Sequence, residues 1–339
     1  MYGVFVKNMV DGLINEGVTI SAQAIISKRP KGVLQYFVAY CVYFARGFLG
    51  LFKKFDLIYC HYALHNAPLA LLIRVFSDKP LVVNIHGSDM LGRGWSVRLL
   101  EPFRSLLLKR ATLIVVPSNF MKRRTMKLTG LPEEKFFVSP SGGIALPNMT
   151  NQTKTLNEEV MFGYVGRIVA GKGVFILLEA LSALTLANPT LDWKLIVAGS
   201  GPDEGSLLKT AKEHGLENRI IWKGIVPQKE LAPIFSQMTV LVFPTLLEES
   251  LGLVGLEAMA HGVPVIGSKI GGLQDYIIDQ KNGLLYEAGD IEALTKILQT
   301  LCVNRDVINK MKDQALVTSQ KYEAGNVSEQ LYHKLCTLM

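Results

Sequence analysis

The sequence predicts an α/β protein built from two Rossmann-like, doubly wound domains that face each other across a cleft. Short apolar runs alternate with amphipathic stretches almost from end to end, as expected for alternating strands and helices. The apolar runs are continuous, which indicates parallel strands buried on both faces. The length of 339 residues suits two domains of ~150 residues better than a single core.

The composition excludes several classes of protein. With 49% hydrophobic and 19% charged residues and no biased tract, the chain does not have the composition of a disordered, fibrous or repeat protein. The cysteines are scattered and form no CxxC pair, which argues against a disulfide framework or a zinc site and favours a reducing, cytoplasmic location: they are Cys41, Cys60, Cys302 and Cys336. Charged residues interrupt the N-terminal stretch, so no secretory signal is expected.

The first half of the chain alternates candidate strands and helices. Each strand candidate is rich in Val, Ile, Leu or Tyr and is bounded by charge, Gly or Pro: Thr19–Ile26, Asp56–Tyr62, Pro80–His86, Thr112–Pro117 and Lys135–Ser139. Helical periodicity marks the stretches between them: Phe5–Gly17, Asn66–Ser77, Ser96–Arg110 and Ser118–Thr129.

The second half repeats this alternation. Its strand candidates are Val160–Val165, Trp193–Ala198, Arg219–Trp222, Val240–Phe243 and Val263–Ile266. The polar stretch Pro147–Glu159 shows neither the helical nor the strand periodicity of apolar residues, which indicates a linker. We therefore place one domain at 1–150 and the next from 151. Ligands of such sheets bind outside the carboxyl ends of the strands, and we expect the chemistry where two such edges face each other.

The segment Val33–Phe52 is apolar over nearly a membrane-spanning length and is followed by Lys53 and Lys54. Its place between two strand candidates favours a buried or partly exposed crossover helix. Its aromatic residues and basic flank are also compatible with a helix lying in a membrane interface. Gln35, Arg46 and two glycines argue against a true span.

Charge is divided unevenly along the chain. Residues 1–150 hold 19 Lys and Arg against 8 Asp and Glu, whereas the remaining residues hold 17 against 21. A basic first half suggests an anionic partner, either nucleic acid, anionic membrane lipid or a phosphorylated acceptor. A solvated basic face without a partner is the alternative.

The densest group of chemical residues lies between Pro244 and Ile266, where a strand runs through a loop into a helix. Glu249 is placed before or at the helix start, and Glu257 follows eight residues later, ~12 Å away if the stretch is helical. The backbone N–H groups of Ser250, Leu251, Gly252, Leu253 and Val254 would hold phosphate oxygens, aided by the helix dipole.

Two further groups close strand candidates. Gly166–Gly173 is a glycine-rich turn with the cations Arg167 and Lys172, suited to neutralising a diphosphate without a metal, and it matches neither a Walker loop nor a dinucleotide fingerprint. His86-Gly-Ser-Asp89 ends an apolar strand of the first half, a position that favours contact of His86 with a ligand.

These groups, in this order, resemble the family 4 retaining glycosyltransferases (glycosyl transferases group 1), which have the two-Rossmann fold called GT-B. The pair Glu249 and Glu257, with the trailing Ala-Met-Ala-x-Gly-x-Pro-Val, resembles the family signature, and Ile196–Pro202 and Lys223–Ile225 also match the family's donor domain. The resemblance implies an acceptor-side domain at 1–150, a nucleotide-sugar donor domain at 151–320, and a C-terminal helix at 321–339 returning to the first domain.

The resemblance also implies a role for each matching residue. Arg167 and Lys172 would bind the donor's diphosphate, Glu257 the ribose hydroxyls, and Glu249 the donor sugar near the reacting carbon. His86 would reach the sugar from the facing domain. Ser250 to Val254 would offer backbone donors, and Ile225 would line the nucleobase pocket.

The implied reaction is metal-independent transfer of a sugar, with retention, from a uridine or guanosine diphosphate donor to a glycan or lipid-linked acceptor. The resemblance suggests front-face attack without a covalent intermediate. Cations and a helix terminus would stabilise the leaving diphosphate, so no cofactor or metal is expected. Assembly of cell-surface polysaccharide at the cytoplasmic membrane face would use such a reaction.

The chain departs from the family pattern at its start. Family members open with a strand and a glycine-rich loop, whereas here Met1-Tyr-Gly3 directly precedes the first helix. The first strand is central in such a sheet and has no counterpart here, so either Met1 is not the true start or the chain is a remnant of the fold. Gly3 matches the loop glycine that approaches the donor phosphates. Pro140–Ile144 also replaces the family's usual Asn-Gly-Val-Asp.

Two other readings remain. The missing strand is compatible with a non-catalytic sugar-nucleotide-binding or scaffold protein. The basic stretch Lys122–Lys127 reads as one helix face with no interleaved aromatic residue, so nucleic-acid binding is not expected.

Overall fold

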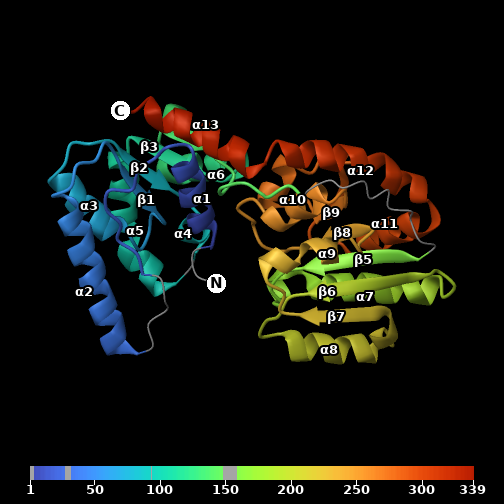
Figure 1. Ribbon diagram of the computed structural model, residues 1–339. Helices are drawn as coiled ribbons and strands as arrows, with labels where there is room; N and C mark the ends of the chain where they lie inside the picture. The colour runs from blue at the N-terminus through green and yellow to red at the C-terminus, as the bar shows by residue number, and fades with distance from the viewer. Residues whose placement is uncertain (1–3, 27–31, 93, 148–158) are drawn as a thin grey trace. The chain divides into compact units, whose positions relative to one another are not determined.

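The structure, a computed structural model, describes residues 4–26, 32–92, 94–147 and 159–339. The chain forms two compact units (Figure 1). The first comprises Met1–Gly143 together with Ala324–Met339, and the second comprises Ile144–Glu323.

The first unit contains an all-parallel sheet of order β1-β2-β3-β4. Its strands are β1 (Ile58–His61), β2 (Leu81–Asn84), β3 (Leu113–Val116) and β4 (Phe136–Val138). Its helices are α1 (Val4–Asn15), α2 (Val33–Gly50), α3 (Ala67–Val75), α4 (Ser88–Leu91), α5 (Trp95–Arg110), α6 (Asn119–Thr129) and α13 (Ala324–Cys336).

Helices cover both faces of this sheet. On one face, Val82 and Val115 pack with α1 and α13 through Met9, Leu13 and Leu331. On the other face, alternate strand residues pack with α3, α5 and α6. Every residue of β2 and β3 is buried, as the continuous apolar runs predict.

One strand prediction for this unit is wrong. Thr19–Ile26 is not a strand, and most of its residues are exposed. The sheet of this unit is formed by β1 to β4, and Thr19–Ile26 pairs with none of these strands.

The second unit contains a parallel sheet of order β10-β9-β8-β5-β6-β7. Its strands are β5 (Val160–Val165), β6 (Trp193–Ala198), β7 (Ile220–Gly224), β8 (Val240–Phe243), β9 (Val265–Ser268) and β10 (Gly283–Tyr286). Its α-helices are α7 (Val174–Ala187), α8 (Glu204–Glu213), α9 (Ala232–Phe235), α10 (Leu253–Ala260), α11 (Ile291–Val303) and α12 (Arg305–Gln320). The sequence reading missed β10.

Two buried layers enclose this second sheet. Val160, Phe162 and alternate residues of the neighbouring strands pack against α7, α8 and α11. Ile196, Leu241 and the other set of alternate residues pack against α9 and α10. The predicted fold class, an α/β protein with two doubly wound domains, is therefore confirmed.

The order of the second sheet reverses at its centre. From β5 the chain adds β6 and β7 on one side, and then returns to add β8, β9 and β10 on the other. The boundary between β5 and β8 is thus a topological switch point, where ligands of open parallel sheets bind outside the carboxyl ends of the strands.

Candidate active site

Two loops meet at this switch point, Gly166–Gly173 after β5 and Pro244–Gly252 after β8. The N–H of Leu246 donates to the carbonyl of Gly171 at 2.9 Å. Gly173 has φ +73°, and a Cβ there would lie 1.6 Å from the carbonyl oxygen of Pro244. Only glycine permits this approach, so the two loops form one tightly joined surface.

Lys172 and Glu249 join across the two loops. Lys172 Nζ lies 2.5 Å from Glu249 Oε1, and the two side chains are 28% and 14% exposed. The hydroxyl of Thr245 donates to the same carboxylate oxygen at 3.0 Å. A cation and an anion from different loops therefore lie in contact at the switch point.

The backbone of Glu249 is held by the loop after β9. The N–H of Gly272 donates to the carbonyl of Glu249 at 2.8 Å. A Cβ on Gly271, which has φ +60°, would lie 2.6 Å from the backbone nitrogen of Glu249. The carboxylate therefore projects from backbone that is fixed on both sides.

Helix α10 begins later than the sequence suggests. Gly252 precedes it in the left-handed conformation, and the first helical residue is Leu253. The estimated helical rise from Glu249 to Glu257 therefore does not apply, because residues 249–252 are not helical. The N–H groups of Leu253 and Val254 lie in the first turn, where a helix has no acceptor of its own.

The other two residues of the predicted phosphate-binding stretch differ in exposure. Leu251 is buried in the core, so only its backbone is available to a ligand. Ser250 is half-buried. The carbonyl of Gly252 accepts a hydrogen bond from the hydroxyl of Tyr276 at 3.1 Å, which fixes the start of α10.

Glu257 lies on α10 and is bonded to the loop after β7. Gln228 Nε2 donates to Glu257 Oε1 at 2.6 Å. Burial raises the pKa of the Glu257 carboxyl above its ordinary value, and the hydrogen bond from Gln228 opposes that rise. Ile225 lies in the same loop and is 80% exposed, an apolar side chain presented to solvent at the carboxyl edge of the sheet.

Arg167 is exposed in the loop after β5. Its backbone carbonyl accepts a hydrogen bond from the hydroxyl of Tyr164 at 2.9 Å. Burial raises the pKa of that hydroxyl, and the negative charge of Glu249 raises it further. Tyr164 therefore stays a neutral donor that orients the loop carrying both cations.

His86 belongs to the first unit, where it follows β2 and pairs with a second histidine. His61 Nδ1 and His86 Nε2 are 3.0 Å apart, so one ring donates and the other accepts. Tyr62, with φ +61°, places its ring 4.3 Å from that of His86. Burial lowers the pKa of His86 to about 4. Burial and the neighbouring ring lower the pKa of His61 to about 3.

Asp89 fixes the backbone that carries this histidine pair. Its carboxylate accepts the N–H of Ala63 at 2.8 Å and the N–H of His86 at 3.0 Å. The side chain is almost fully buried, and burial raises its pKa despite these hydrogen bonds. The loops that follow β1 and β2 are thereby joined.

The structure thus groups the predicted residues unevenly. Lys172 and Glu249 are in direct contact, Arg167 shares a loop with Lys172, and Glu257 lies on the helix that follows Glu249. His86 lies in the other unit. Gly3 lies outside the described residues.

The sequence reading missed three supporting residues. Thr245, Gln228 and His61 bond directly to Glu249, Glu257 and His86. Each is a polar residue at or just after the carboxyl end of a strand. A polar residue at the carboxyl end of a predicted strand is therefore the sequence signal that could have identified them.

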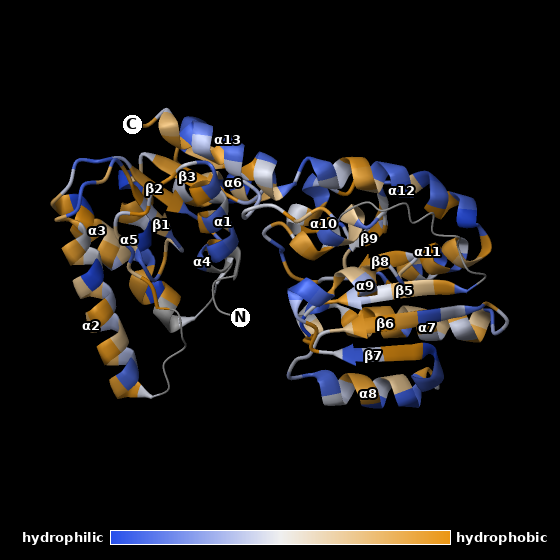
Figure 2. Ribbon diagram, in the orientation of Figure 1, coloured by the Kyte–Doolittle hydropathy of each residue, from blue (hydrophilic) through white to orange (hydrophobic). Residues whose placement is uncertain are grey.

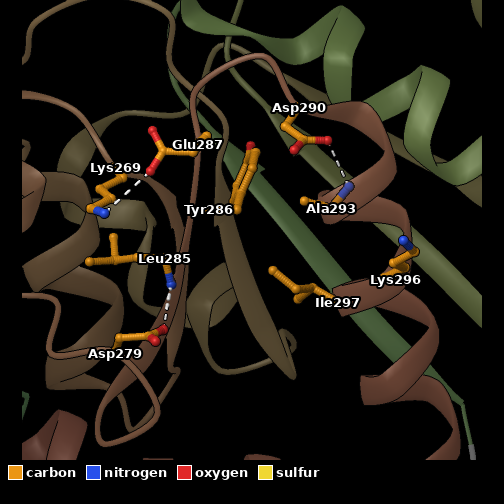
Figure 3. Close-up of a pocket in the computed structure, with 9 residues that line it drawn as sticks. All are labelled: Lys269, Asp279, Leu285, Tyr286, Glu287, Asp290, Ala293, Lys296 and Ile297. Carbon is orange, nitrogen blue, oxygen red and sulfur yellow. Dashed lines mark hydrogen bonds and ion pairs between the residues drawn. The ribbon is translucent and has the colours of Figure 1, made fainter.

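A cavity of about 510 Å³ lies elsewhere in the second unit, between β10 and the start of α11 (Figure 3). Its polar side chains are already engaged. Lys269 pairs with Glu287, Asp279 accepts the N–H of Leu285, and Asp290 accepts the N–H of Ala293. It includes none of the predicted site residues and presents no unpaired charge cluster for a ligand.

Two family models cover most of the chain. The model described as "Glycosyl transferases group 1" matches residues 147–317, and the model described as "Glycosyltransferase Family 4" matches residues 9–142. The first match contains the loops after β5 and β8 together with α10, and the second contains the histidine pair.

Curated relatives carry glycosyltransferase names. "Uncharacterized glycosyltransferase YqgM" of Bacillus subtilis is 28% identical over 265 residues, which cover 77% of this chain and 72% of the relative. A D-inositol 3-phosphate glycosyltransferase of Corynebacterium urealyticum is 31% identical over 186 residues, which cover 52% of this chain and 44% of the relative.

Solved structures share the fold at low identity. Anabaena Alr3699/HepE in complex with UDP and glucose has a TM-score of 0.72 at 19% identity, covering 87% of this chain and 81% of that one. Sucrose-phosphate synthase from Thermosynechococcus elongatus has a TM-score of 0.78 at 20% identity, covering 100% and 94%. With the two family matches, this likeness establishes that the chain belongs to the glycosyl transferases group 1 family and is a glycosyltransferase of the GT-B fold.

Proposed function

We propose that the protein transfers a sugar, with retention of anomeric configuration and without a metal ion, from a nucleoside diphosphate sugar to a glycan or lipid-linked acceptor. The observation that carries the proposal is the contact between Lys172 and Glu249 at the switch point of the second sheet. The bond to be broken joins a diphosphate to a sugar. The cation at that edge suits the diphosphate, and the carboxylate suits the hydroxyls of the sugar.

The diphosphate is assigned to Arg167, Lys172 and the first turn of α10. Negative charge develops on the diphosphate as its bond to the sugar breaks, and prearranged cations and amides stabilise that charge. The N–H groups of Leu253 and Val254 add the positive end of the helix dipole. These groups supply the neutralisation that a divalent cation gives in other transferases.

The sugar and the nucleoside are assigned to the two glutamates and the loop after β7. Glu249 accepts hydrogen bonds from sugar hydroxyls while Lys172 moves toward the phosphate. Glu257 accepts hydrogen bonds from the ribose hydroxyls, and its bond from Gln228 holds the carboxylate in place. Ile225 offers an exposed apolar surface to the base. The solved relative that contains UDP and glucose supports this class of donor.

His86 is assigned to the donor sugar from the first unit. Its lowered pKa keeps the imidazole neutral near pH 7, so the ring can donate or accept a hydrogen bond without adding charge. Retention follows when the acceptor hydroxyl attacks from the face that the diphosphate leaves, and the departing phosphate takes the acceptor's proton. We place the reaction at the cytoplasmic membrane face, in assembly of cell-surface polysaccharide.

The test is calorimetric binding of uridine and guanosine diphosphate sugars, followed by transfer assays with the ligand that binds. We expect one donor to bind, Glu249→Ala to abolish transfer, and the exposed neighbour variant Glu248→Ala to retain it. The anomeric configuration of the product, read by nuclear magnetic resonance, tests retention. Failure of every donor to bind, or full activity of Glu249→Ala, would contradict the proposal.

A further inference from the structure

Helix α2 is an apolar helix that the first unit leaves largely uncovered. Its 18 residues have a mean hydropathy of 1.2, and 6% of them are buried. Tyr43 is its buried residue, whereas Val33 is 88% exposed and Phe37 is 68% exposed. Figure 2 shows hydrophobic residues along the length of α2. A core helix of a soluble domain buries such residues, so the exposed apolar side chains of α2 indicate an interaction surface.

The exposed apolar surface continues beyond α2. The Phe48 ring lies 5.9 Å from the Phe52 ring and 5.9 Å from the Phe76 ring, both edge to face. Phe76 follows the end of α3, where Val75 is also exposed. We call this surface the apolar ridge; its exposed members are Val33, Leu34, Tyr36, Phe37, Val38, Tyr40, Val42, Phe48, Leu49, Phe52, Val75 and Phe76.

The ridge is fixed to the unit by small residues. A Cβ on Gly47 would lie 2.7 Å from the Leu69 side chain of α3, and a Cβ on Gly50 would lie 3.1 Å from Ala22. These glycines lie near the C-terminal end of α2 and let that end pack closely, whereas residues 33–38 at the other end are all exposed. The unit therefore covers one end of the helix and leaves the other end uncovered.

The stretch of sequence that carries α2 has charges of one sign only, whereas beside Phe76 the acidic Asp78 pairs with Arg74. From Gly17 to Phe55 the sequence contains no Asp or Glu, and its cations are Lys28, Arg29, Lys31, Arg46, Lys53 and Lys54. Lys53 and Lys54 are exposed directly after the helix. Large apolar side chains beside clustered cations are the combination that binds an anionic lipid surface, because the former enter the acyl boundary and the latter meet the headgroups.

We propose that α2 and the end of α3 dock the protein on an anionic membrane, with α2 lying in the interface. A second copy of the chain fits this surface poorly, because a two-fold contact would place the cations of both copies opposite one another. The proposal does not depend on the donor or on the reaction.

A transmembrane path is disfavoured by the neighbours of α2. The ends of a single span lie on opposite sides of the bilayer. Here α1 precedes the helix and β1 follows it, yet Tyr59 of β1 donates a hydrogen bond to Met9 Sδ of α1 at 3.5 Å. Spanning would separate elements that share one core.

The test is flotation of the full chain with vesicles of phosphatidylcholine alone or with added phosphatidylglycerol. We expect binding to the anionic vesicles, weakening as salt is raised. Each lysine near an anionic surface contributes about fivefold in affinity, so the double variant Lys53→Gln, Lys54→Gln should bind about 25-fold more weakly. Leu34→Ser with Phe37→Ser should weaken binding at least about tenfold by removing inserted apolar area.

Matched changes in the second unit serve as controls. Leu186 and Val303 are equally exposed apolar residues, and Lys281 and Lys321 are exposed cations. Replacing either pair in the same way should leave vesicle binding unchanged. Circular dichroism of each variant tests that it is folded. In a further variant, Phe37→Trp, tryptophan fluorescence should shift to the blue and be quenched by brominated lipid.

Three results would overturn the proposal. The first is no flotation with anionic vesicles, and the second is flotation that the α2 variants leave intact. The third is a dimer in analytical ultracentrifugation that Leu34→Ser with Phe37→Ser dissociates, which would make the ridge a self-association surface. Transfer to a soluble acceptor should persist in all α2 variants, so loss of docking and loss of the proposed reaction are separate outcomes.

Discussion

Lys172 Nζ, from the loop after β5, lies 2.5 Å from Glu249 Oε1, from the loop after β8. The two residues are 77 positions apart in the chain; Gly173 makes a close backbone contact beside Lys172, and Gly271 of the loop after β9 makes one with Glu249. Without a donor, each side chain offsets the charge of the other. On binding, we expect the lysine to turn to the diphosphate and the glutamate to turn to the sugar.

Removal of the lysine amine should slow the reaction more than it weakens binding. Loss of one donor to a developing anion costs about 10²–10³-fold in rate, or roughly 3–4 kcal/mol. We expect a fall of that size in kcat for Lys172→Ala and a smaller fall for Lys172→Arg, which keeps the charge. Steady-state kinetics measure both, with Lys281→Ala as an exposed-cation control. A kcat for Lys172→Ala within twofold of the parent protein would rule out the assigned role.

Donor binding should weaken in mild acid because of Glu257. Its pKa is raised by burial, so as the pH falls the carboxylate takes up a proton earlier than an ordinary glutamate does and no longer accepts two ribose hydrogen bonds. Glu257→Gln should bind the donor roughly tenfold more weakly near neutral pH, since a hydrogen bond to a charged group contributes about 1.5–3 kcal/mol. It should also lose the acid dependence.

Gln228→Ala provides a second check on Glu257. The Gln228 hydrogen bond lowers the pKa of Glu257, so its removal should move the acid midpoint of donor binding to higher pH. Calorimetry with an intact nucleotide sugar is suitable, because its diphosphate does not titrate in this range. An unchanged midpoint in both variants would assign the acid dependence to another group.

The histidine pair should make the first unit less stable in acid. Burial lowers the pKa of His86 to about 4 and is the main reason that the pKa of His61 falls to about 3, against an ordinary 6.5. Below pH 6.5 the unfolded chain binds protons that the folded chain refuses. The free energy of unfolding therefore falls as the pH drops toward 4, by up to about 2 kcal/mol for each histidine at pH 5.

Hydrogen exchange of the β2 amides across this pH range measures that loss. His61→Gln should make the free energy of unfolding fall less steeply with decreasing pH, by the contribution of one histidine. Equal slopes in the parent protein and His61→Gln would show that the pair does not control the acid response.

The contact between the two loops at the switch point should tolerate no side chain at Gly173. Alanine there combines an unfavourable φ of +73° with a Cβ placed 1.6 Å from the Pro244 carbonyl. We expect Gly173→Ala to reduce the free energy of unfolding by roughly 2–4 kcal/mol. Gly205 lies in α8 with nothing within 4 Å of its Cβ position, so Gly205→Ala should stabilise by about 0.5–1 kcal/mol. Urea unfolding of both variants tests this contrast.

Much of the second unit could be predicted because its strands are marked locally. Val160–Val165, Trp193–Ala198 and Val240–Phe243 were predicted with the bounds that the structure has, since each is a continuous apolar run with clear ends. β10 was missed because Gly-Leu-Leu-Tyr is short and has no β-branched residue. Thr19–Ile26 was predicted wrongly because β-propensity forms no strand without a neighbouring strand to pair with.

The site was predictable residue by residue but not in its pairings. Lys172 and Glu249 stand out in sequence as charged residues beside glycine-rich turns. Their contact depends on the order of β5 and β8 in the sheet, which local patterns do not specify. The same holds for Gln228 with Glu257 and for His61 with His86, which are 29 and 25 residues apart in the chain.

The loop after β7 is packed less tightly than the loops after β5 and β8. Gly173 and Gly271 lock those two against neighbouring backbone, whereas Ile225 faces solvent and a Cβ on the adjacent Gly224 would meet nothing within 4 Å. Substitutions of Ile225 should therefore change the free energy of unfolding little. In the donor arrangement proposed above, selectivity for one base over another could change at this position without altering the residues assigned to the diphosphate.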